Sequence, residues 1–201
     1  MYETIKTYFP NGCPICDGPI TFNERTFIYF CLDCGAYVSA HRDDTEFTAK
    51  FQPTGYLANK EVNLLRKAVL DAMKPLFLER VKIQGRHNTI ETSLVNVLHK
   101  DYCVRLRLDD EEIVYGKVIS NTDQTDYKIF IIDSGKTVTV APEELENVTN
   151  RDKTKIWLAQ KLGLKVSECN IKHLNEKQLE KALEVLTEGV NESRQQAIDS
   201  S

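Results

Sequence analysis

The stretch CPICDGPITFNERTFIYFCLDC, residues 13–34, decides the fold of the N-terminal part of the chain. It contains two C-x2-C motifs, Cys13/Cys16 and Cys31/Cys34, separated by 14 residues. Two residues between a pair of thiols let one tight turn direct both toward the same ion, and zinc prefers four soft ligands in a tetrahedron. We therefore predict that these four cysteines bind one Zn²⁺ ion.

The residues around the thiols fit the turns that such a site needs. Each turn requires a residue that tolerates a left-handed backbone, and Asp17-Gly18 and Gly35 follow the second cysteine of each pair. Between the pairs, residues 18–30 are rich in β-branched and aromatic side chains, which predicts a β-hairpin. Two turns on one hairpin form a zinc ribbon. With four protein ligands and no open position, the predicted site is structural rather than catalytic.

Other interpretations of the cysteines are weaker. A redox C-x-x-C motif is typically a single motif beside a βαβ pattern, not a pair that flanks a hairpin. Cys103 falls in an alternating strand and Cys169 in a helical region, where buried apolar thiols are expected. His41 is a candidate second-shell donor or an exposed turn histidine; the sequence favours neither.

The composition limits the functional classes. The 201 residues include 26 basic and 30 acidic residues, a net charge of −4, and 41% are hydrophobic. No apolar run approaches the roughly 20 residues that cross a bilayer, and residues 1–10 lack signal-peptide features, so we expect a cytoplasmic protein with reduced cysteines. Nucleophile elbow, phosphate loop and H-E-x-x-H motifs are absent, and the four histidines have no metal or triad spacing. We expect no enzymatic activity.

The middle of the chain predicts a small barrel. Residues 59–75 read as a helix capped by Asn59 and stopped by Pro75. From residue 81, a short helix precedes four or five strands, one of them bent at Gly116. This order is similar to an Sm-like barrel, and SH3-like and Tudor-like barrels fit nearly as well.

The C-terminal part predicts two helices and a tail. One helix is expected in 151–164, capped by Asp152 or Thr154, and another begins at Asn175. The predicted fold class is α+β: a zinc ribbon with packed helices, plus a small β-barrel (80–150) and a disordered tail (191–201).

Several tracts together resemble a bacterial and phage zinc-finger-containing domain family of unknown function. They are CPIC and CLDCGAYVSAH, a helix ending in KPLF, and WLAQKLGL followed by ECNIKHLNEKQLEKAL. The resemblance covers about residues 11–79 and 154–187, and it implies that the four ribbon cysteines are the metal ligands. The chain departs from the family in two ways. At 169–174, CNIKHL replaces a tract like CHIGMF, and the predicted barrel stands between two parts that follow each other almost directly in the family. The resemblance therefore implies one discontinuous ribbon and helical domain (1–79 and 151–190) with an inserted small β-barrel (80–150). The family has no settled activity, so the resemblance implies none.

Two binding functions remain. In the first, a non-enzymatic zinc-ribbon adaptor binds nucleic acid through the ribbon and the barrel. Its candidate contact residues are Arg25, Tyr29, Arg66, Lys67, Asn121 and Lys136, and Asp123 lies in the same barrel loop as Asn121. In the alternative, a phage-type accessory protein binds a host protein of the transcription, replication or defence machinery and modulates or inhibits it. Self-association through the barrel is a further option. The acidic balance favours the protein partner, whereas the predicted folds favour nucleic acid.

Overall fold

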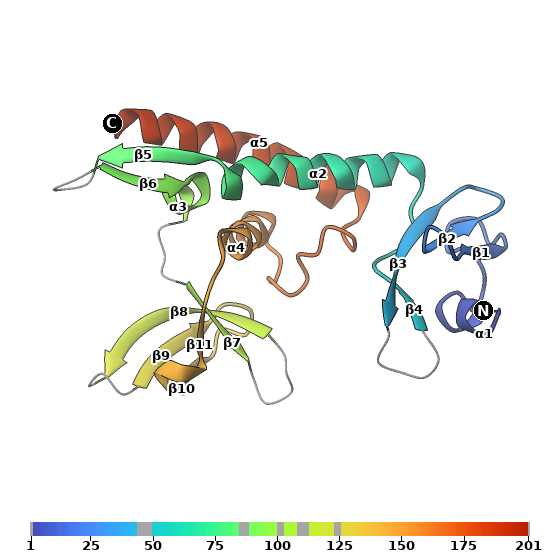
Figure 1. The fold of residues 1–201 in the computed structure, drawn as a ribbon, viewed down its shortest axis with the longest axis horizontal. Coiled ribbons are helices and arrows are strands. Elements are labelled where there is room, and N and C mark those ends of the chain that lie inside the picture. Colours follow the sequence, from blue (N-terminus) through green and yellow to red (C-terminus); the bar gives the residue numbers. More distant parts are fainter. Residues whose placement is uncertain are drawn as a thin grey trace. The chain divides into compact units, whose positions relative to one another are not determined.

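The computed structural model describes residues 2–43, 50–84, 89–99, 103–107, 113–122 and 126–200, which fold as a mixed α+β chain (Figure 1). The predicted fold class is confirmed at this level. The chain forms two compact units, Met1–Ala68 with Ile171–Leu179, and Val69–Asn170 with Glu180–Ser201. We call them the first and the second unit.

The first unit is built on a four-stranded antiparallel sheet. Helix α1 (Tyr2–Tyr8) precedes it, and the strands follow in sheet order. They are β1 (Ile20–Asn23), β2 (Ile28–Cys31), β3 (Tyr37–Asp43) and β4 (Lys50–Pro53). The pairing of β1 with β2 confirms the hairpin predicted between the cysteine pairs. Asn23 shapes its turn, because its Oδ1 accepts hydrogen bonds from the N–H groups of Arg25 and Thr26.

Aromatic rings fill the core of this unit. The ring of Tyr29 is fully buried, and its centroid lies 4.6 Å from that of Phe22 and 5.3 Å from that of Phe9. Its hydroxyl donates a 2.6 Å hydrogen bond to the carbonyl of Phe51, and burial raises the pKa of Tyr29 to about 12. Cys13 and Cys31 belong to the same buried cluster, so the cysteine turns are part of the core.

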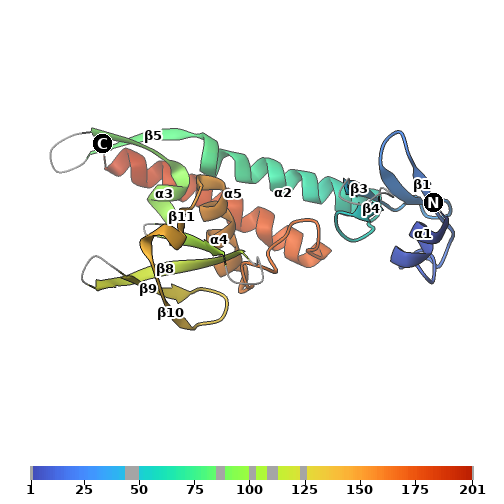
Figure 2. The ribbon, with the colours of Figure 1, turned by 60° about the horizontal axis from the view of Figure 1, so that its bottom comes forward.

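The second unit contains a curled five-stranded antiparallel sheet, seen from two directions in Figures 1 and 2. Its strand order is β10-β9-β8-β7-β11. The strands are β7 (Cys103–Arg107), β8 (Ile113–Thr122), β9 (Asp126–Ile131), β10 (Thr137–Val140) and β11 (Leu145–Asn147), with the 3-10 helix η1 (Pro142–Glu144) before β11. Within the described residues β10 and β11 are the two edges, so the structure shows a half-barrel.

Gly116 and a bulge explain the curl. A Cβ at Gly116 would lie 2.2 Å from Cγ2 of Ile129, so glycine permits the two strands to pack closely at this point. The register shift itself lies between Val118 and Ser120, near the position where the sequence predicts a bend. The concave face buries Val104, Leu106, Ile129 and Ile131.

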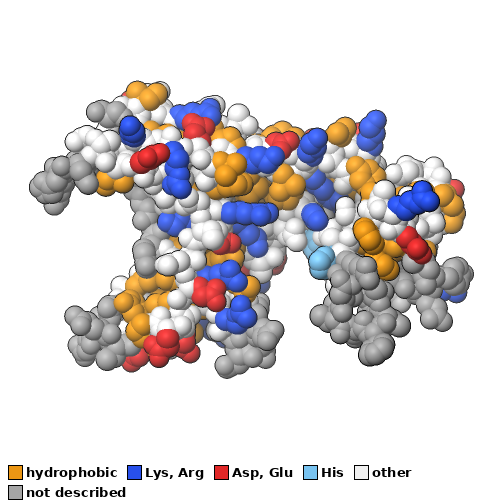
Figure 3. All heavy atoms as spheres, viewed as in Figure 1, with side chains coloured by type: hydrophobic (Ala, Val, Ile, Leu, Met, Phe, Trp, Pro, Cys, Tyr) orange, Lys and Arg blue, Asp and Glu red, His pale blue; other side chains and the backbone are white. Residues whose placement is uncertain are grey.

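This sheet also exposes apolar side chains. Hydrophobic side chains gather over its strands in Figure 3, and Ile113, Ile119 and Phe130 are exposed. The candidate Asp123 and the acidic residues 109–112 lie outside the described residues.

Helices complete both units. They are α2 (Lys60–Leu78), α3 (Leu94–Leu98), α4 (Asn150–Leu162) and α5 (Glu176–Asp199), and a hairpin of β5 (Arg80–Gln84) and β6 (Thr89–Ser93) joins α2 to α3. The predicted cap of α2 is confirmed, since Asn59 Oδ1 accepts the N–H of Val62 at 2.9 Å. The predicted stop at Pro75 is wrong. The helix passes through the proline and ends at Leu78. Leu76, the residue directly after the proline, is fully buried.

The start of α4 also differs from the prediction. Thr149 is the cap and Asp152 is the third helical residue, and each side chain binds the backbone N–H of the other. Gly163 ends the helix with φ +68°. Trp157 is a core residue, and a Cβ at Gly189 would lie 2.4 Å from its ring.

The predicted disordered tail is wrong for residues 191–199, which continue α5. Ser193 and Ala197 are buried, and Arg194 donates two hydrogen bonds to the carboxylate of Glu79, at 2.9 and 2.5 Å. The buried residues here are small, so they leave no apolar periodicity in the sequence. The contact with Glu79 keeps this end of the helix ordered.

Two hydrogen-bonded contacts tie the curled sheet to α4 and the segment after it. The hydroxyl of Tyr115 donates to Asp152 at 3.0 Å, and Asp133 accepts the N–H groups of Val166 and Ser167 at 2.6 and 2.8 Å. The sheet and these helical residues therefore form one unit. The predicted boundaries, which separate 80–150 from 151–190, do not follow the compact units.

The Asp133 contact predicts a pH-dependent contribution to stability. Partial burial alone would raise the pKa of Asp133, but the hydrogen bonds from Ser167 and Val166 outweigh it and lower the pKa. A lowered folded-state pKa means that the contribution is present above the unfolded pKa of about 3.9 and is lost as the pH falls through the folded value. In Asp133→Asn, one of the two accepting oxygens becomes an NH2 group, which faces a backbone N–H and cannot accept its hydrogen bond. This change should destabilise the second unit by about 1 kcal/mol at pH 7.

Urea unfolding followed by circular dichroism at pH 7 and pH 3 measures this effect. The difference between wild type and Asp133→Asn should shrink at pH 3. Glu143→Gln, an exposed carboxylate in η1, is the matched control and should behave as wild type at both values. An unchanged midpoint for Asp133→Asn at pH 7 would show that the contact contributes nothing.

Candidate metal centre

The first cysteine turn, residues 12–18, is closed by its own backbone. The N–H of Cys13 donates to the carbonyl of Gly18 at 2.9 Å, and the N–H of Asp17 donates to the carbonyl of Cys13 at 2.8 Å. Asp17 adopts the left-handed backbone that the sequence predicts, with φ +58°. Gly12 is also left-handed, and a Cβ there would lie 2.9 Å from the carbonyl oxygens of Asp17 and Gly18. We call residues 13–18 the first knuckle.

The second knuckle, residues 31–36, repeats this backbone. The N–H of Cys31 donates to the carbonyl of Ala36 at 2.8 Å, and the N–H of Gly35 donates to the carbonyl of Cys31 at 3.1 Å. Gly35 has φ +71°, as predicted. One further bond, from the N–H of Leu32 to the carbonyl of Pro19 at 3.0 Å, joins the second knuckle to the residue after the first.

The knuckles bring all four thiols together. The Sγ atoms of Cys13, Cys16, Cys31 and Cys34 lie within 4.8 Å of one another. The pairs Cys13/Cys34 and Cys16/Cys31 are 3.7 and 3.4 Å apart. A tetrahedron with about 2.3 Å from each sulfur to a central ion has edges of about 3.8 Å, whereas a disulfide needs about 2.05 Å. The four cysteines are free thiols in an arrangement that could hold one metal ion.

Burial acts to raise the pKa of Cys13, Cys16 and Cys31, whereas hydrogen bonds from backbone N–H groups act to lower it. Cys13 accepts the N–H of Ile15 at 3.4 Å, although burial raises the pKa of Cys13. The N–H of Cys34 lowers the pKa of Cys31 to about 7. A hydrogen bond from Gly18 favours the thiolate of Cys16, but the adjacent thiols outweigh it and raise the pKa of Cys16 to about 12. Four thiolates this close need a cation among them.

The other two cysteines belong to the second unit. Cys103 and Cys169 are both buried, as the sequence predicts. Cys103 packs beside His99, whose Nε2 lies 3.3 Å from the thiol. Burial raises the pKa of Cys169 to about 11, which keeps it a neutral, unreactive thiol.

Two predicted nucleic-acid contacts are buried and are corrected here. Tyr29 occupies the centre of the aromatic core, so its ring presents no face to a ligand. Arg66 is buried against the first unit, where its Nη1 donates to the carbonyl of Tyr56 at 3.0 Å and to Asn63 Oδ1 at 3.2 Å. Burial lowers the pKa of Arg66. Arg66 binds its own chain and is not offered to a phosphate.

The remaining candidates do not form one site. Arg25 is exposed in the β1–β2 turn and Lys67 is exposed on α2, both in the first unit. Lys136 is exposed in the β9–β10 turn of the second unit, where Asn121 lies in β8. The structure therefore divides these four residues between its two units.

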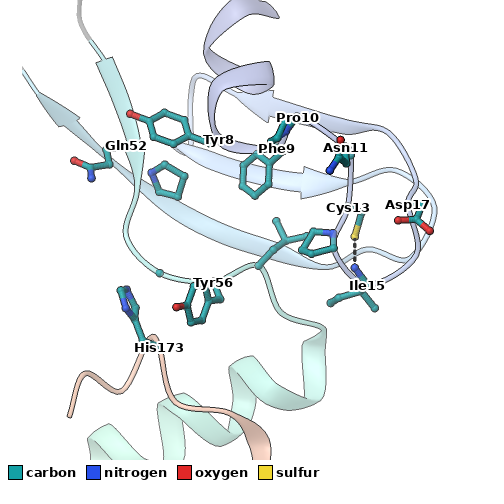
Figure 4. A pocket seen from close by; sticks show the side chains of 15 residues that line it. Tyr8, Phe9, Pro10, Asn11, Cys13, Ile15, Asp17, Gln52, Tyr56 and His173 are labelled. Atoms are coloured by element: carbon teal, nitrogen blue, oxygen red, sulfur yellow. Dashed lines mark hydrogen bonds between the residues drawn. The ribbon is translucent and has the colours of Figure 1, made fainter. Parts of the chain in front are cut away.

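The sequence prediction missed a pocket beside the first knuckle (Figure 4). It has a volume of about 830 Å³. Its lining comes from three separate stretches, residues 8–17, residues 52–57 and His173. The aromatic and proline-rich composition of 8–14 is a signal for it, but the sequence does not show that these stretches meet.

His173 reaches the pocket from a short segment that packs against residues 54–56. The N–H of Tyr56 donates to the carbonyl of Lys172 at 3.3 Å, and the Lys172 ammonium donates to Thr54 Oγ1 at 2.9 Å. A Cβ at Gly55 would lie 2.6 Å from the Cβ of Lys172, so glycine allows this close approach. The ring of His173 then lies 4.9 Å from that of Tyr56.

Comparisons of the chain with protein-family models, with curated proteins and with solved structures found no match. The resemblance to the zinc-finger-containing family stays a prediction. Within the described part of the chain, each helix is too short or too polar to span a bilayer.

The geometry of the cluster predicts that one metal ion binds per chain and that each thiol is required. Cys16 is exposed, so Cys16→Ser removes a ligand without leaving a buried cavity. We expect metal content to fall toward zero after dialysis against a chelator and the first unit to lose its near-ultraviolet circular dichroism, because metal binding and folding are coupled.

Cys169→Ser is the matched control, since it makes the same change at a buried thiol outside the cluster. It should lower stability but keep the metal. Plasma mass spectrometry after desalting gives the metal-to-protein ratio. An equal ratio in wild type and Cys16→Ser would contradict the proposed ligand set.

Proposed function

We propose that the four cysteines hold one structural Zn²⁺ ion. Four thiolates complete a tetrahedral shell and leave no position for water or substrate, which is typical of structural zinc. The ion would supply the positive charge that the clustered thiolates need. Cys13 and Cys31 would transmit this binding energy to the aromatic core, because both lie in its buried cluster.

We further propose that the chain is a binding module for a protein partner. The observation that carries this proposal is a group of exposed apolar side chains around the knuckles. Ile15 is 53% exposed, Leu32 is 61% exposed and Tyr56 is 64% exposed. Ile15 and Leu32 each lie between the two cysteines of a knuckle, where the rigid turn holds them in solvent. Exposed apolar side chains held on a rigid support are typical of protein interaction sites.

Charge also supports a protein partner over nucleic acid. The chain carries a net charge of −4, and four thiolates with one Zn²⁺ add about −2. Nucleic-acid affinity depends mainly on neutralising phosphates with lysine and arginine. Of the basic candidates, Arg66 is buried and the exposed ones are divided between the units. The proposal thus corresponds to the second predicted function, that of an accessory protein that binds and modulates another protein.

For the curled sheet we propose an Sm-like arrangement. Support comes from the preceding helix α3, from the strand bent near Gly116, and from a strand order that sets the last strand, β11, beside the first, β7. Small barrels of this kind bind proteins as well as RNA, so the sheet does not by itself decide between the two partners.

Site-specific photo-crosslinking tests the protein-binding proposal. A benzophenone amino acid at Leu32 should give discrete protein adducts in cells that express the full chain, and the adducts should survive nuclease treatment. The same replacement at Leu64 is the matched control. Leu64 is 57% exposed on α2 in the same unit, away from the knuckles. Loss of the Leu32 adducts after nuclease, or the same adducts from both positions, would argue for nucleic acid or for nonspecific contact.

A further inference from the structure

The pocket beside the first knuckle has walls suited to a flat or extended group. Three aromatic side chains line it, those of Tyr8, Phe9 and Tyr56, together with the imidazole of His173. In Figure 4 these rings lie around one hollow, with the first knuckle on its far side. Pro10, Pro14 and Pro53 add rigid apolar surface.

The charge of the lining is negative. Asp17 is its acidic residue, and neither lysine nor arginine is among the residues described as lining it. The nearby ammonium of Lys172 lies outside the lining and donates to Thr54. Cys13 belongs both to the pocket wall and to the thiol cluster, so the net negative charge of a zinc–thiolate centre adjoins the pocket.

Aromatic rings beside a negative potential favour a weakly hydrated cation. The faces of tyrosine and phenylalanine attract cations through their quadrupoles, and a guanidinium also stacks flat on a ring. An arginine side chain meets each of these conditions. A phosphate or an acidic side chain would be repelled by Asp17 and would find no cationic partner among the described lining residues.

We propose that this pocket binds an arginine side chain on an extended segment of a protein partner. The guanidinium would stack on the rings of Tyr8, Tyr56 and His173, with Asp17 at the knuckle end of the lining, and flanking apolar residues would pack on the prolines and Ile15. The inference rests on the proposed protein-binding function. It adds the chemistry of the recognised side chain.

Nuclear magnetic resonance titration of the zinc-loaded full chain tests this proposal with three probes. They are the capped peptides Ac-Pro-Arg-Pro-NH2, Ac-Pro-citrulline-Pro-NH2 and Ac-Pro-Glu-Pro-NH2. Citrulline has the shape of arginine without its charge. The arginine peptide should shift amide resonances of residues 8–17 and 55–57, and should bind about ten-fold more tightly than the citrulline peptide, as a desolvated cation–π contact implies.

Two variants and a control locate the effect. Tyr56→Ala should abolish the arginine-dependent shifts. Asp17→Asn keeps a residue that tolerates the left-handed backbone, so it should weaken binding and its salt dependence while zinc content stays unchanged. Leu64→Ala, on an exposed helical face outside the pocket, should bind as wild type.

Each contrary result is informative. Equal affinity for the arginine and citrulline peptides, preference for the glutamate peptide, or no shifts at residues 8–17 would overturn the proposal. Shifts of the same amides by a phosphorylated dinucleotide would assign the pocket to nucleic acid instead. If the arginine peptide fails while the Leu32 adducts persist, only the pocket assignment is wrong. If the peptide binds but Leu32 gives no adducts, the exposed knuckle side chains are not the docking surface.

Discussion

In the first unit four thiols lie within 4.8 Å of one another, and they would carry like charges as the thiolates that bind a metal ion. Two of them, Cys13 and Cys31, belong to a small core whose other buried members among the described residues are Tyr29, Ala36, Val38 and Leu57, with partly buried rings such as Phe9 and Phe22 packed against it. A core this small contributes little stability by itself, and units of this size usually need a metal or disulfides. The cation that neutralises the thiolates would therefore also connect the knuckles to the aromatic core, and so to the sheet that holds them.

Local features of this fold could be predicted from the sequence, because the interactions that produce them span few residues. The left-handed positions at Asp17 and Gly35, and the side-chain cap at Asn59, each depend on contacts within six residues. The predictions that were wrong depend on distant contacts. Helix α2 continues through Pro75 because its last turn is packed in the second unit, and residues 191–199 are helical because Arg194 reaches Glu79, 115 positions away.

In the candidate site, too, the features that depend on local spacing could be predicted, and those that depend on distant contacts could not. The spacing of the cysteines encodes the thiol cluster, but spacing does not encode burial, so Tyr29 and Arg66 were assigned to a surface that they do not reach. The pocket went unpredicted because it joins residues 8–17 to residues 52–57 and to His173, more than 110 positions away. The side chains that line it are mostly ordinary aromatic and apolar residues in the sequence. The chain order does not show that they meet, so the sequence does not join them into a common site.

The β9–β10 turn shows what the metal would add. Residues 131–136 repeat the knuckle backbone: the N–H of Ile131 donates to the carbonyl of Lys136 at 2.8 Å, the N–H of Gly135 donates to Ile131 at 2.9 Å, and Gly135 has φ +68°. This turn contains no cysteine. Its polar anchor is Asp133, which binds the N–H groups of Val166 and Ser167.

The same turn thus forms without thiols, closed by a left-handed glycine. The backbone of each knuckle can therefore form without metal. The free energy of metal binding would instead stabilise the position of one knuckle relative to the other. The first knuckle carries Ile15 and part of the pocket wall, and the second carries Leu32. The metal would therefore fix these parts of the proposed binding surface relative to one another while taking no part in the contact itself.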